Sequence, residues 1–131
     1  MPTHAAFALV LALAVLASEP AKACDRNQFV IKYDVGSAQI SQKDKVRLKK
    51  FARTAKHRTQ VCLFGQADAQ GDPEFNRLLA AERVNGVRDY LLAHGIEEES
   101  FSIGAQGESF TLWGLLSADN ARERSVTVSH D

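Results

Sequence analysis

Three polar side chains in the middle of the chain have the types and the spacing to bind a small zwitterion. Asp68 follows a short apolar run, and Asn76 and Arg83 lie farther on in a segment with a helical period. Asn76 and Arg83 are seven residues apart, so a helix would place them almost above one another. The carboxylate of Asp68 can hold an ammonium group, and the planar guanidinium of Arg83 can hold a carboxylate by two parallel hydrogen bonds. Asn76 would fix either the loop or the ligand.

The neighbouring sequence predicts the strand, turn and helix that would position these groups. Residues 61–64 are an apolar run that ends at Gly65, which is typical of a short buried strand. Residues 70–73 have turn chemistry, with a proline suited to the first turn of a helix. After Phe75, apolar residues recur at spacings of three and four and predict a stripe that faces the core: Ala80, Val84, Val87 and Leu91. Arg83 lies beside this stripe, so we expect its replacement to leave the fold intact.

This stretch resembles the signature of the OmpA C-terminal-like domain, which is shared with the peptidoglycan-associated lipoproteins. The matching positions are Gly65, Asp68, Gly71, Asn76, Leu79 and Arg83. The resemblance extends over roughly residues 27–129, from a segment similar to the family's first strand to a basic segment before the last one. It implies a peptidoglycan-binding module in which Asp68 and Arg83 hold the diaminopimelate residue of the stem peptide, with Asn76 and Leu79 as further residues of the site.

The resemblance also implies that the end of the first strand borders the ligand pocket and offers backbone N–H groups there. Gly36 stands at that strand end, where relatives often have Asp or Asn, so we expect a backbone contact from it. Two positions depart from the family pattern. Gln66 replaces a residue that is usually His, Tyr or similar, and only Arg124 is kept from the closing Asn-Arg-Arg triplet. The altered triplet changes what the tail can contribute, and the Asp68–Arg83 pair is intact.

The expected elements alternate between strands and helices. Strands are predicted at residues 28–35, 61–64, 101–103 and 125–129, and helices at residues 42–57 and from about 73 to 94, with Ser41 as the first N-cap. The order β-α-β-α-β-β favours an α/β fold, a two-layer sandwich of a mixed sheet with both helices on one face. The first helix would bury Leu48, Phe51, Ala52 and Ala55.

Basic residues gather on the first predicted helix. Residues 42–58 contain eight of the 16 lysines and arginines of a chain whose net charge is zero. The simpler interpretation is that these residues form a solvated helix face. The more specific one is that they attract anionic polymers of the envelope. No nucleic-acid motif is present, so nucleic acid is not an expected partner.

The N-terminal segment has the composition of a secretory signal peptide. Residues 5–17 are an unbroken run of small and apolar residues, too short for a comfortable membrane span, and residues 21–23 match the A-x-A cleavage pattern. The run lacks the amphipathic pattern that a buried N-terminal helix would show. We therefore expect a signal peptide at residues 1–23, one domain at residues 24–131, and a location in the periplasm, in association with the outer membrane or free of it.

The two cysteines would both lie in the exported part. An oxidising compartment favours a disulfide between Cys24 and Cys62, which would tie the N-terminal arm to the central sheet. The alternatives are a buried free thiol at Cys62 and lipidation of Cys24, although Ala21 and Lys22 are not the residues that a lipoprotein signal prefers.

No catalytic pattern is visible. His57, His94 and His130 fall at element ends or in the tail, without a spacing typical of metal ligands, and no nucleophile–base motif or phosphate loop is present. We therefore expect a non-catalytic binding module without a cofactor or metal. The alternative is a protein-interaction domain on the same scaffold, with envelope proteins as partners and the ligand pocket lost or repurposed.

The signal peptide generates the first prediction. Cleavage after Ala23 should leave Cys24 as an unlipidated N-terminus. The intact mass of the exported protein measures this directly, and an added diacylglyceryl mass would contradict it.

Overall fold

The computed structural model describes residues 24–66, 72–105 and 124–131. In this part of the chain the elements follow one another in the predicted order: β1 (Arg26–Lys32), α1 (Gln42–Ala55), β2 (Val61–Gln66), α2 (Pro73–Ala93), a short 3-10 helix (Glu98–Ser100), β3 (Phe101–Ala105) and β4 (Ser125–His130). The proposed signal peptide and Asp68 lie outside the described residues. Neither described helix is long and apolar enough to cross a membrane.

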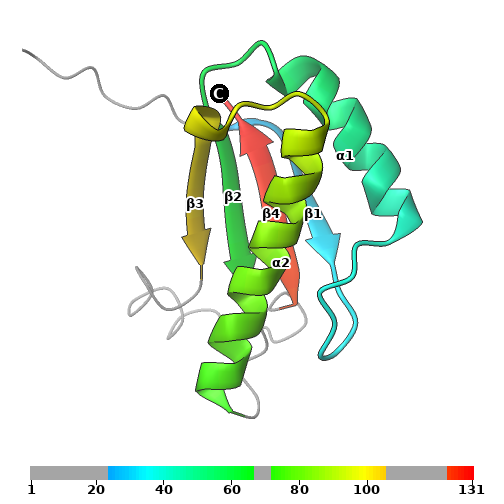
Figure 1. Cartoon of the computed structure of the whole chain (residues 1–131), viewed down its shortest axis with the longest axis vertical. Coiled ribbons are helices and arrows are strands. Elements are labelled where there is room, and N and C mark those ends of the chain that lie inside the picture. The colour runs from blue at the N-terminus through cyan, green and yellow to red at the C-terminus, as the bar shows by residue number, and fades with distance from the viewer. Residues whose placement is uncertain (1–23, 67–71, 106–123) are drawn as a thin grey trace, which may run out of the picture.

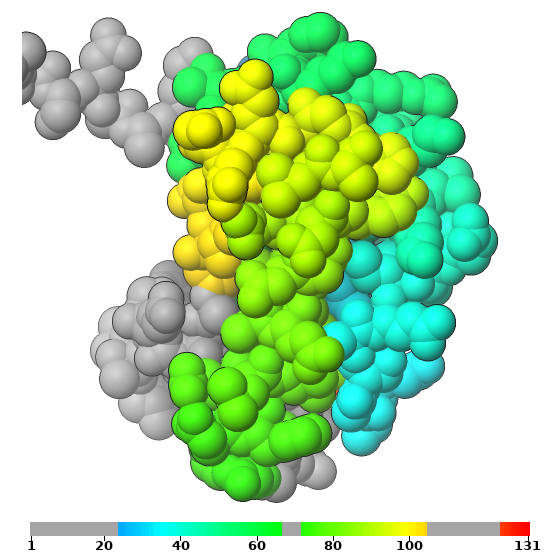
Figure 2. Space-filling view, in the orientation of Figure 1, coloured from blue at the N-terminus to red at the C-terminus, as the bar shows by residue number. Residues whose placement is uncertain are grey.

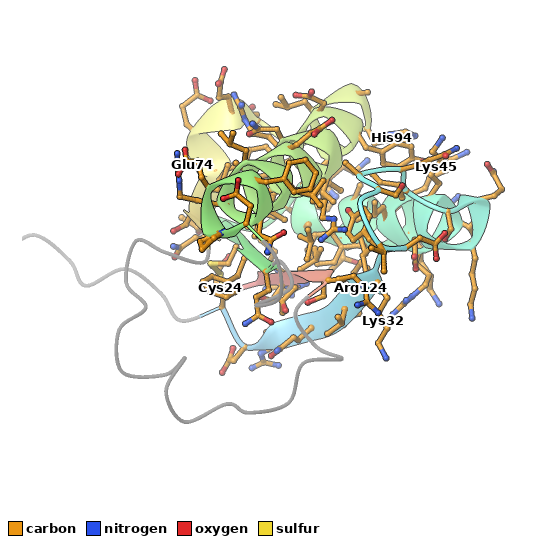
Figure 3. The ribbon with its side chains drawn as sticks, turned by 90° about the horizontal axis from the view of Figure 1, so that it is seen from below. Cys24, Lys32, Lys45, Glu74, His94 and Arg124 are labelled. Carbon is orange, nitrogen blue, oxygen red and sulfur yellow. A yellow bond between two sulfur atoms is a disulfide. The ribbon has the colours of Figure 1, made fainter. Side chains whose placement is uncertain are left out.

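The strands form one mixed sheet. Its order is β1-β4-β2-β3, in which β4 is antiparallel to both of its neighbours and β3 runs parallel to β2. Both helices cover the same face of the sheet, with α2 across its middle and α1 beside β1 (Figures 1 and 3). The predicted two-layer α/β architecture is therefore confirmed.

The predicted apolar faces form the core between the two layers. The four apolar residues expected on α1 and the four on α2 are all buried, together with Ile31, Val61, Leu63 and Val128 from the sheet. Ser41 caps α1 as predicted, because its hydroxyl accepts a 3.1 Å hydrogen bond from the backbone N–H of Asp44. The strand predicted at residues 28–35 ends earlier, at Lys32. The residues after Lys32 leave the sheet to enter a turn.

Gly65 lets α2 lie directly on β2. A Cβ atom at this position would fall 2.3 Å from Cγ2 of Val84 and 2.8 Å from the carbonyl oxygen of Ala80. Real side chains do not approach so closely, so only glycine fits under this turn of the helix. The same close approach sets the height of Arg83 above the sheet, because Arg83 sits between these two positions on α2.

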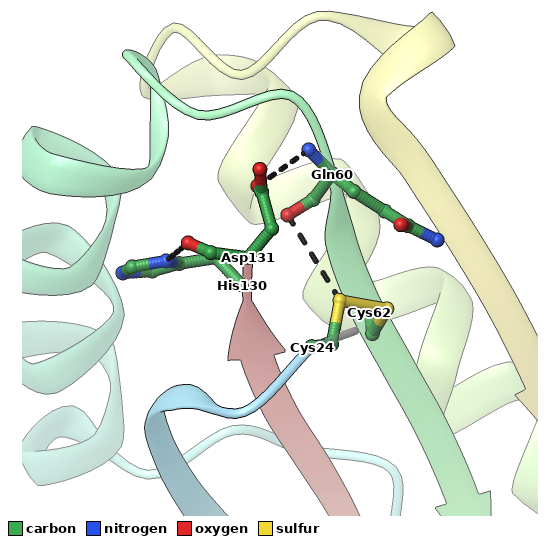
Figure 4. Close-up of a disulfide and its surroundings, with 5 residues drawn as sticks. All are labelled: Cys24, Gln60, Cys62, His130 and Asp131. Carbon is green, nitrogen blue, oxygen red and sulfur yellow. Dashed lines mark hydrogen bonds between the residues drawn. A yellow bond between two sulfur atoms is a disulfide. The ribbon is translucent and has the colours of Figure 1, made fainter. Parts of the chain in front are cut away.

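The predicted disulfide is present and connects the chain ahead of β1 to β2 (Figure 4). Cys24 and Cys62 have their Cα atoms 6.1 Å apart. Since β4 lies between β1 and β2, the bridge joins β2 to the start of a strand that is not its neighbour in the sheet. Next to it, Asp131 is fixed to Gln60, whose backbone N–H donates a 2.8 Å hydrogen bond to the Asp131 carboxylate. A bridge of this span stabilises a chain by about 3–4 kcal/mol in the chain-entropy description.

Tyr33 lies in the core immediately after β1. It is 6% exposed, and its hydroxyl has no hydrogen-bond partner in the part of the chain that the structure describes. Burial raises the pKa of this hydroxyl well above its usual range, with a smaller opposing effect of Arg83. A buried hydroxyl without a partner destabilises a fold, because it loses its hydrogen bonds to water.

Two glycines give a matched test of the α2–β2 contact. Gly65→Ala should lower the free energy of unfolding by about 1–3 kcal/mol, because the added methyl group overpacks the interface. Gly86→Ala is the control: no atom lies within 4 Å of its Cβ position on α2, so the substitution should raise stability by about 0.5–1 kcal/mol. Urea unfolding measures both, and equal effects of the two substitutions would contradict the packing argument.

Tyr33→Phe should stabilise the protein by about 1 kcal/mol, because it removes the unpaired hydroxyl and keeps the ring. The difference should grow above about pH 10, where the unfolded tyrosine ionises and the buried one cannot. A raised pKa in the folded state means that the wild type loses stability as the pH rises past this value. Thermal unfolding of both proteins between neutral and alkaline pH measures the difference. A less stable Tyr33→Phe protein would contradict the assignment.

Candidate ligand-binding site

The predicted site residues gather at one end of the sheet. The carboxyl ends of β1, β2 and β3 meet the start of β4 and the N-terminal half of α2 at this end, which is the lower one in Figure 1. The connection between β1 and α1, drawn in cyan, lies against α2 in Figure 2. Loops that follow parallel strands are a frequent location of binding sites, because several chain segments converge there.

Arg83 is the best-defined residue of the site. Its side chain is fully buried, with 0% exposure. Nε donates a 2.7 Å hydrogen bond to the main-chain oxygen of Ser37, and Nη2 donates a 3.1 Å bond to that of Asp34. The guanidinium carbon also lies 4.9 Å from the centre of the Tyr33 ring, a cation–π contact. Arg83 therefore joins α2 to the end of β1.

The expectation that Arg83 is dispensable for the fold is wrong. It lies beside the apolar stripe in sequence, but its long side chain runs inward and reaches the β1–α1 connection instead of solvent. Each hydrogen bond to a charged group contributes about 1.5–3 kcal/mol, and a shorter side chain at this position would lose both of them. A change at Arg83 therefore perturbs the loop as well as any ligand contact.

Gly36 forms the tip of a tight turn that Arg83 holds. The backbone N–H of Ser37 donates a 3.1 Å hydrogen bond to the carbonyl of Asp34, and Gly36 between them has a positive φ of 69°. A positive φ at the third residue is what a type II turn requires, and glycine adopts it without strain. Gly36 is exposed, so its backbone is open to solvent at this end of the sheet. Gly36 lies between the two residues whose main-chain oxygens Arg83 binds.

Asn76 and Leu79 lie in the first turns of α2. Asp72 caps this helix by accepting a 3.0 Å hydrogen bond from the N–H of Glu74, and Pro73 occupies its first turn. Asn76 is half-buried and Leu79 is 8% exposed. Together with Arg83 they follow one side of the helix from its N-terminus toward the β1–α1 turn. Asp68 belongs to the segment outside the described residues, so its distance from Arg83 is not assigned.

The two departures from the family pattern border the same end of the sheet. Gln66 ends β2 and pairs with Ser125. Arg124 precedes β4, and its carbonyl accepts a 2.9 Å hydrogen bond from the N–H of Tyr33.

At the start of α2, the hydrogen bond from Arg77 holds the pKa of the exposed Glu74 carboxyl below its usual range. No cluster of three or more metal-binding side chains occurs in the ranges 24–66, 72–105 and 124–131.

Sequence reasoning missed the partners of Arg83 in the β1–α1 connection. The main-chain oxygens of Asp34 and Ser37 are 49 and 46 residues away in sequence, and backbone groups leave no residue-type signal. The turn itself was detectable, because Gly36 follows a strand and allows a positive φ.

Comparisons with known proteins agree with this geometry. The profile of the OmpA family matches residues 32–124. Outer membrane protein A of Buchnera aphidicola subsp. Schizaphis graminum is 30% identical over 69 residues, which are 53% of this chain and 20% of that protein. Outer membrane protein A of Shimwellia blattae is 31% identical over 68 residues, 52% of this chain and 28% of that protein. The chain thus matches less than a third of the length of these relatives.

Solved structures share the fold. The peptidoglycan-associated lipoprotein from Burkholderia pseudomallei superposes with a TM-score of 0.64 at 20% identity, over 78% of this chain and 89% of that one. The cell wall anchor of the T6SS from Pseudomonas aeruginosa gives 0.59 at 19% identity, over 79% of each chain. With its family profile spanning most of the chain and its sheet and helices arranged as in these structures, the protein belongs to the OmpA family.

Proposed function

We propose that this protein is a non-catalytic module that anchors to peptidoglycan in the periplasm, close to the outer membrane. Its ligand would be the diaminopimelate residue of the stem peptide, held between Asp68 and Arg83. The observation that carries the proposal is the position of Arg83, a cation fixed beside an exposed backbone turn at the end of the sheet. The names of two structural neighbours, a peptidoglycan-associated lipoprotein and a cell wall anchor, support an association with peptidoglycan.

Arg83 would serve the loop and the ligand at once. A guanidinium is a planar fork of N–H donors that suits a carboxylate, and the bonds to Asp34 and Ser37 fix its orientation. A cation in a buried position acts on a nearby carboxylate with little screening by water. Gly36 at the tip of the turn would add a backbone N–H, and Asn76 and Leu79 would line the side formed by α2. Asp68 would meet the ammonium group of the ligand.

The complete burial of Arg83 favours one alternative. A side chain with 0% exposure can be a purely structural clamp, and the domain would then recognise an envelope protein instead of peptidoglycan. The two functions differ in their dependence on Asp68, because only the peptidoglycan site needs its carboxylate to hold an ammonium group.

The ligand assignment generates the fourth prediction. Asp68→Asn and Asn76→Ala should weaken binding to purified sacculi, the former by about ten- to a hundredfold, because it removes a charge-assisted contact. Asp89→Asn is the matched control: it removes an equal charge from an exposed position on α2 and should leave binding unchanged. Co-sedimentation with sacculi, with free diaminopimelate as competitor, measures all three.

Arg83 needs a stability readout beside the binding assay. Arg83→Lys keeps the charge and loses the planar fork, so it should weaken binding and also lower the melting temperature. Sacculus binding that survives Asp68→Asn would overturn the assignment of the ligand pair. Binding that is absent in the wild type, together with an unchanged fold, would favour the protein-interaction alternative.

A further inference from the structure

A second surface with the features of a binding site lies at the opposite side of the sheet from β3, between β1 and α1. A groove of about 370 Å³ opens there, lined by Asn27, Phe29, Arg47, Lys50, Phe51 and Thr54, with Gln28 beside them. It shares no residue with the site at the strand ends.

The floor of the groove is aromatic. The rings of Phe29 and Phe51 meet edge to face with their centres 5.6 Å apart. His130 lies behind them, with its ring centre 5.4 Å from that of Phe51. The guanidinium carbon of Arg47 lies over the Phe29 ring, 4.6 Å from its centre, so an apolar side chain that packs on this floor takes the place of the guanidinium.

The rim of the groove is cationic. Arg47 and Lys50 line it and are exposed, and the exposed Lys43 continues their line along α1 beyond the groove. The nearby carboxylate of Asp44 is already engaged, by Arg47 at 3.0 Å and by the hydroxyl of Ser41 at 3.0 Å. The groove therefore presents net positive charge, which complements a carboxylate-bearing partner.

One wall of the groove is an open strand edge. β1 pairs only with β4 among the described strands, so its other side has main-chain groups that no strand covers. The carbonyl of Val30 faces this side, since it accepts a hydrogen bond from Nη1 of Arg47. That bond is long, at 3.4 Å, and exposed, so another donor can replace it at low cost. Exposed strand edges are where an extended peptide adds to a sheet.

An irregularity at Asn27 shapes the mouth of the groove. The pairing of β1 with β4 shifts register between Arg26 and Phe29, and Asn27 has a φ of 49°, in the left-handed region. Its side-chain amide donates a 2.9 Å hydrogen bond to Nε2 of His130, whose Nδ1 faces the carbonyl of Asp131. Bulges of this kind end regular pairing and redirect side chains, and they gather near functional sites.

We propose that this groove binds an extended acidic segment of a partner protein. The segment pairs with the free side of β1, places an apolar side chain over Phe29 and Phe51, and directs its carboxylates toward Arg47 and Lys50. One of its N–H groups replaces Arg47 at the Val30 carbonyl, and the guanidinium moves off the Phe29 ring while it stays paired with Asp44. The proposal is independent of the peptidoglycan site.

A short fluorescent peptide, in which glutamate alternates with valine and phenylalanine, tests the proposal. The full exported protein should bind it, as measured by fluorescence anisotropy. Lys50→Glu should weaken binding about fivefold, as expected for an exposed charge pair. Lys49→Glu carries the same charge change on the same helix outside the groove and should have no effect.

Backbone pairing needs its own test. Val30→Pro removes an N–H that faces away from β4, a position where an edge strand tolerates proline, and should abolish binding with little change in melting temperature. A peptide that is N-methylated at alternate residues, which keeps its charge, should also fail to bind.

Three outcomes would overturn the proposal. If the methylated peptide bound as tightly as the unmethylated one, the surface would attract anions nonspecifically and would not pair with a peptide backbone. A lack of any binding to the unmethylated peptide would remove the site. A wild-type dimer that Val30→Pro dissociates would assign the edge of β1 to a second copy of this chain. If Val30→Pro unfolds the protein, two comparisons still test the proposal. One compares binding of the methylated and unmethylated peptides, and the other compares Lys50→Glu with Lys49→Glu.

Discussion

The structure depends on one buried cation that joins two layers. Arg83 leaves α2, passes the ring of Tyr33 and binds the main-chain oxygens of Asp34 and Ser37. An unpaired charge in this position would destabilise the fold strongly, so the turn after β1 must be in place for α2 to lie where it does. The exposed backbone of Gly36 is therefore set by a contact made 47 residues farther along the chain. The conformation of the turn at Gly36 therefore depends on a tertiary contact with α2.

Close packing of α2 on the sheet makes this contact possible. Gly65 allows the helix to approach β2, and the apolar stripe that includes Val84 holds it there. With a bulkier residue at Gly65 the helix would rise, and the bonds of Arg83 to the β1–α1 turn would lengthen. Gly65 on β2 and Arg83 on α2 therefore both depend on the distance between the helix and the sheet.

Much of this fold could be predicted, because periodic burial leaves a residue-type pattern. The buried faces of α1 and α2, the N-cap at Ser41 and the mixed sheet all followed from spacing and capping chemistry. The disulfide was an expectation from composition and compartment. The role of Arg83 was misjudged, because a helical period gives the direction of a Cα–Cβ bond and not the reach of a long side chain. Its partners are backbone groups, which no residue type identifies.

The disulfide changes how a pull on the N-terminal arm would spread through the domain. A pull applied at Cys24 reaches the sheet at two points, at the start of β1 and, through the covalent bridge, at Cys62 in β2. β1 is hydrogen-bonded on one side by β4, whereas β2 is bonded on both sides, by β4 and β3. Tension therefore enters an interior strand that runs straight to the end of the sheet where Gln66 and the turn of Gly36 lie. Through the bridge, β2 connects the disulfide end of the sheet mechanically to the end where the candidate site lies.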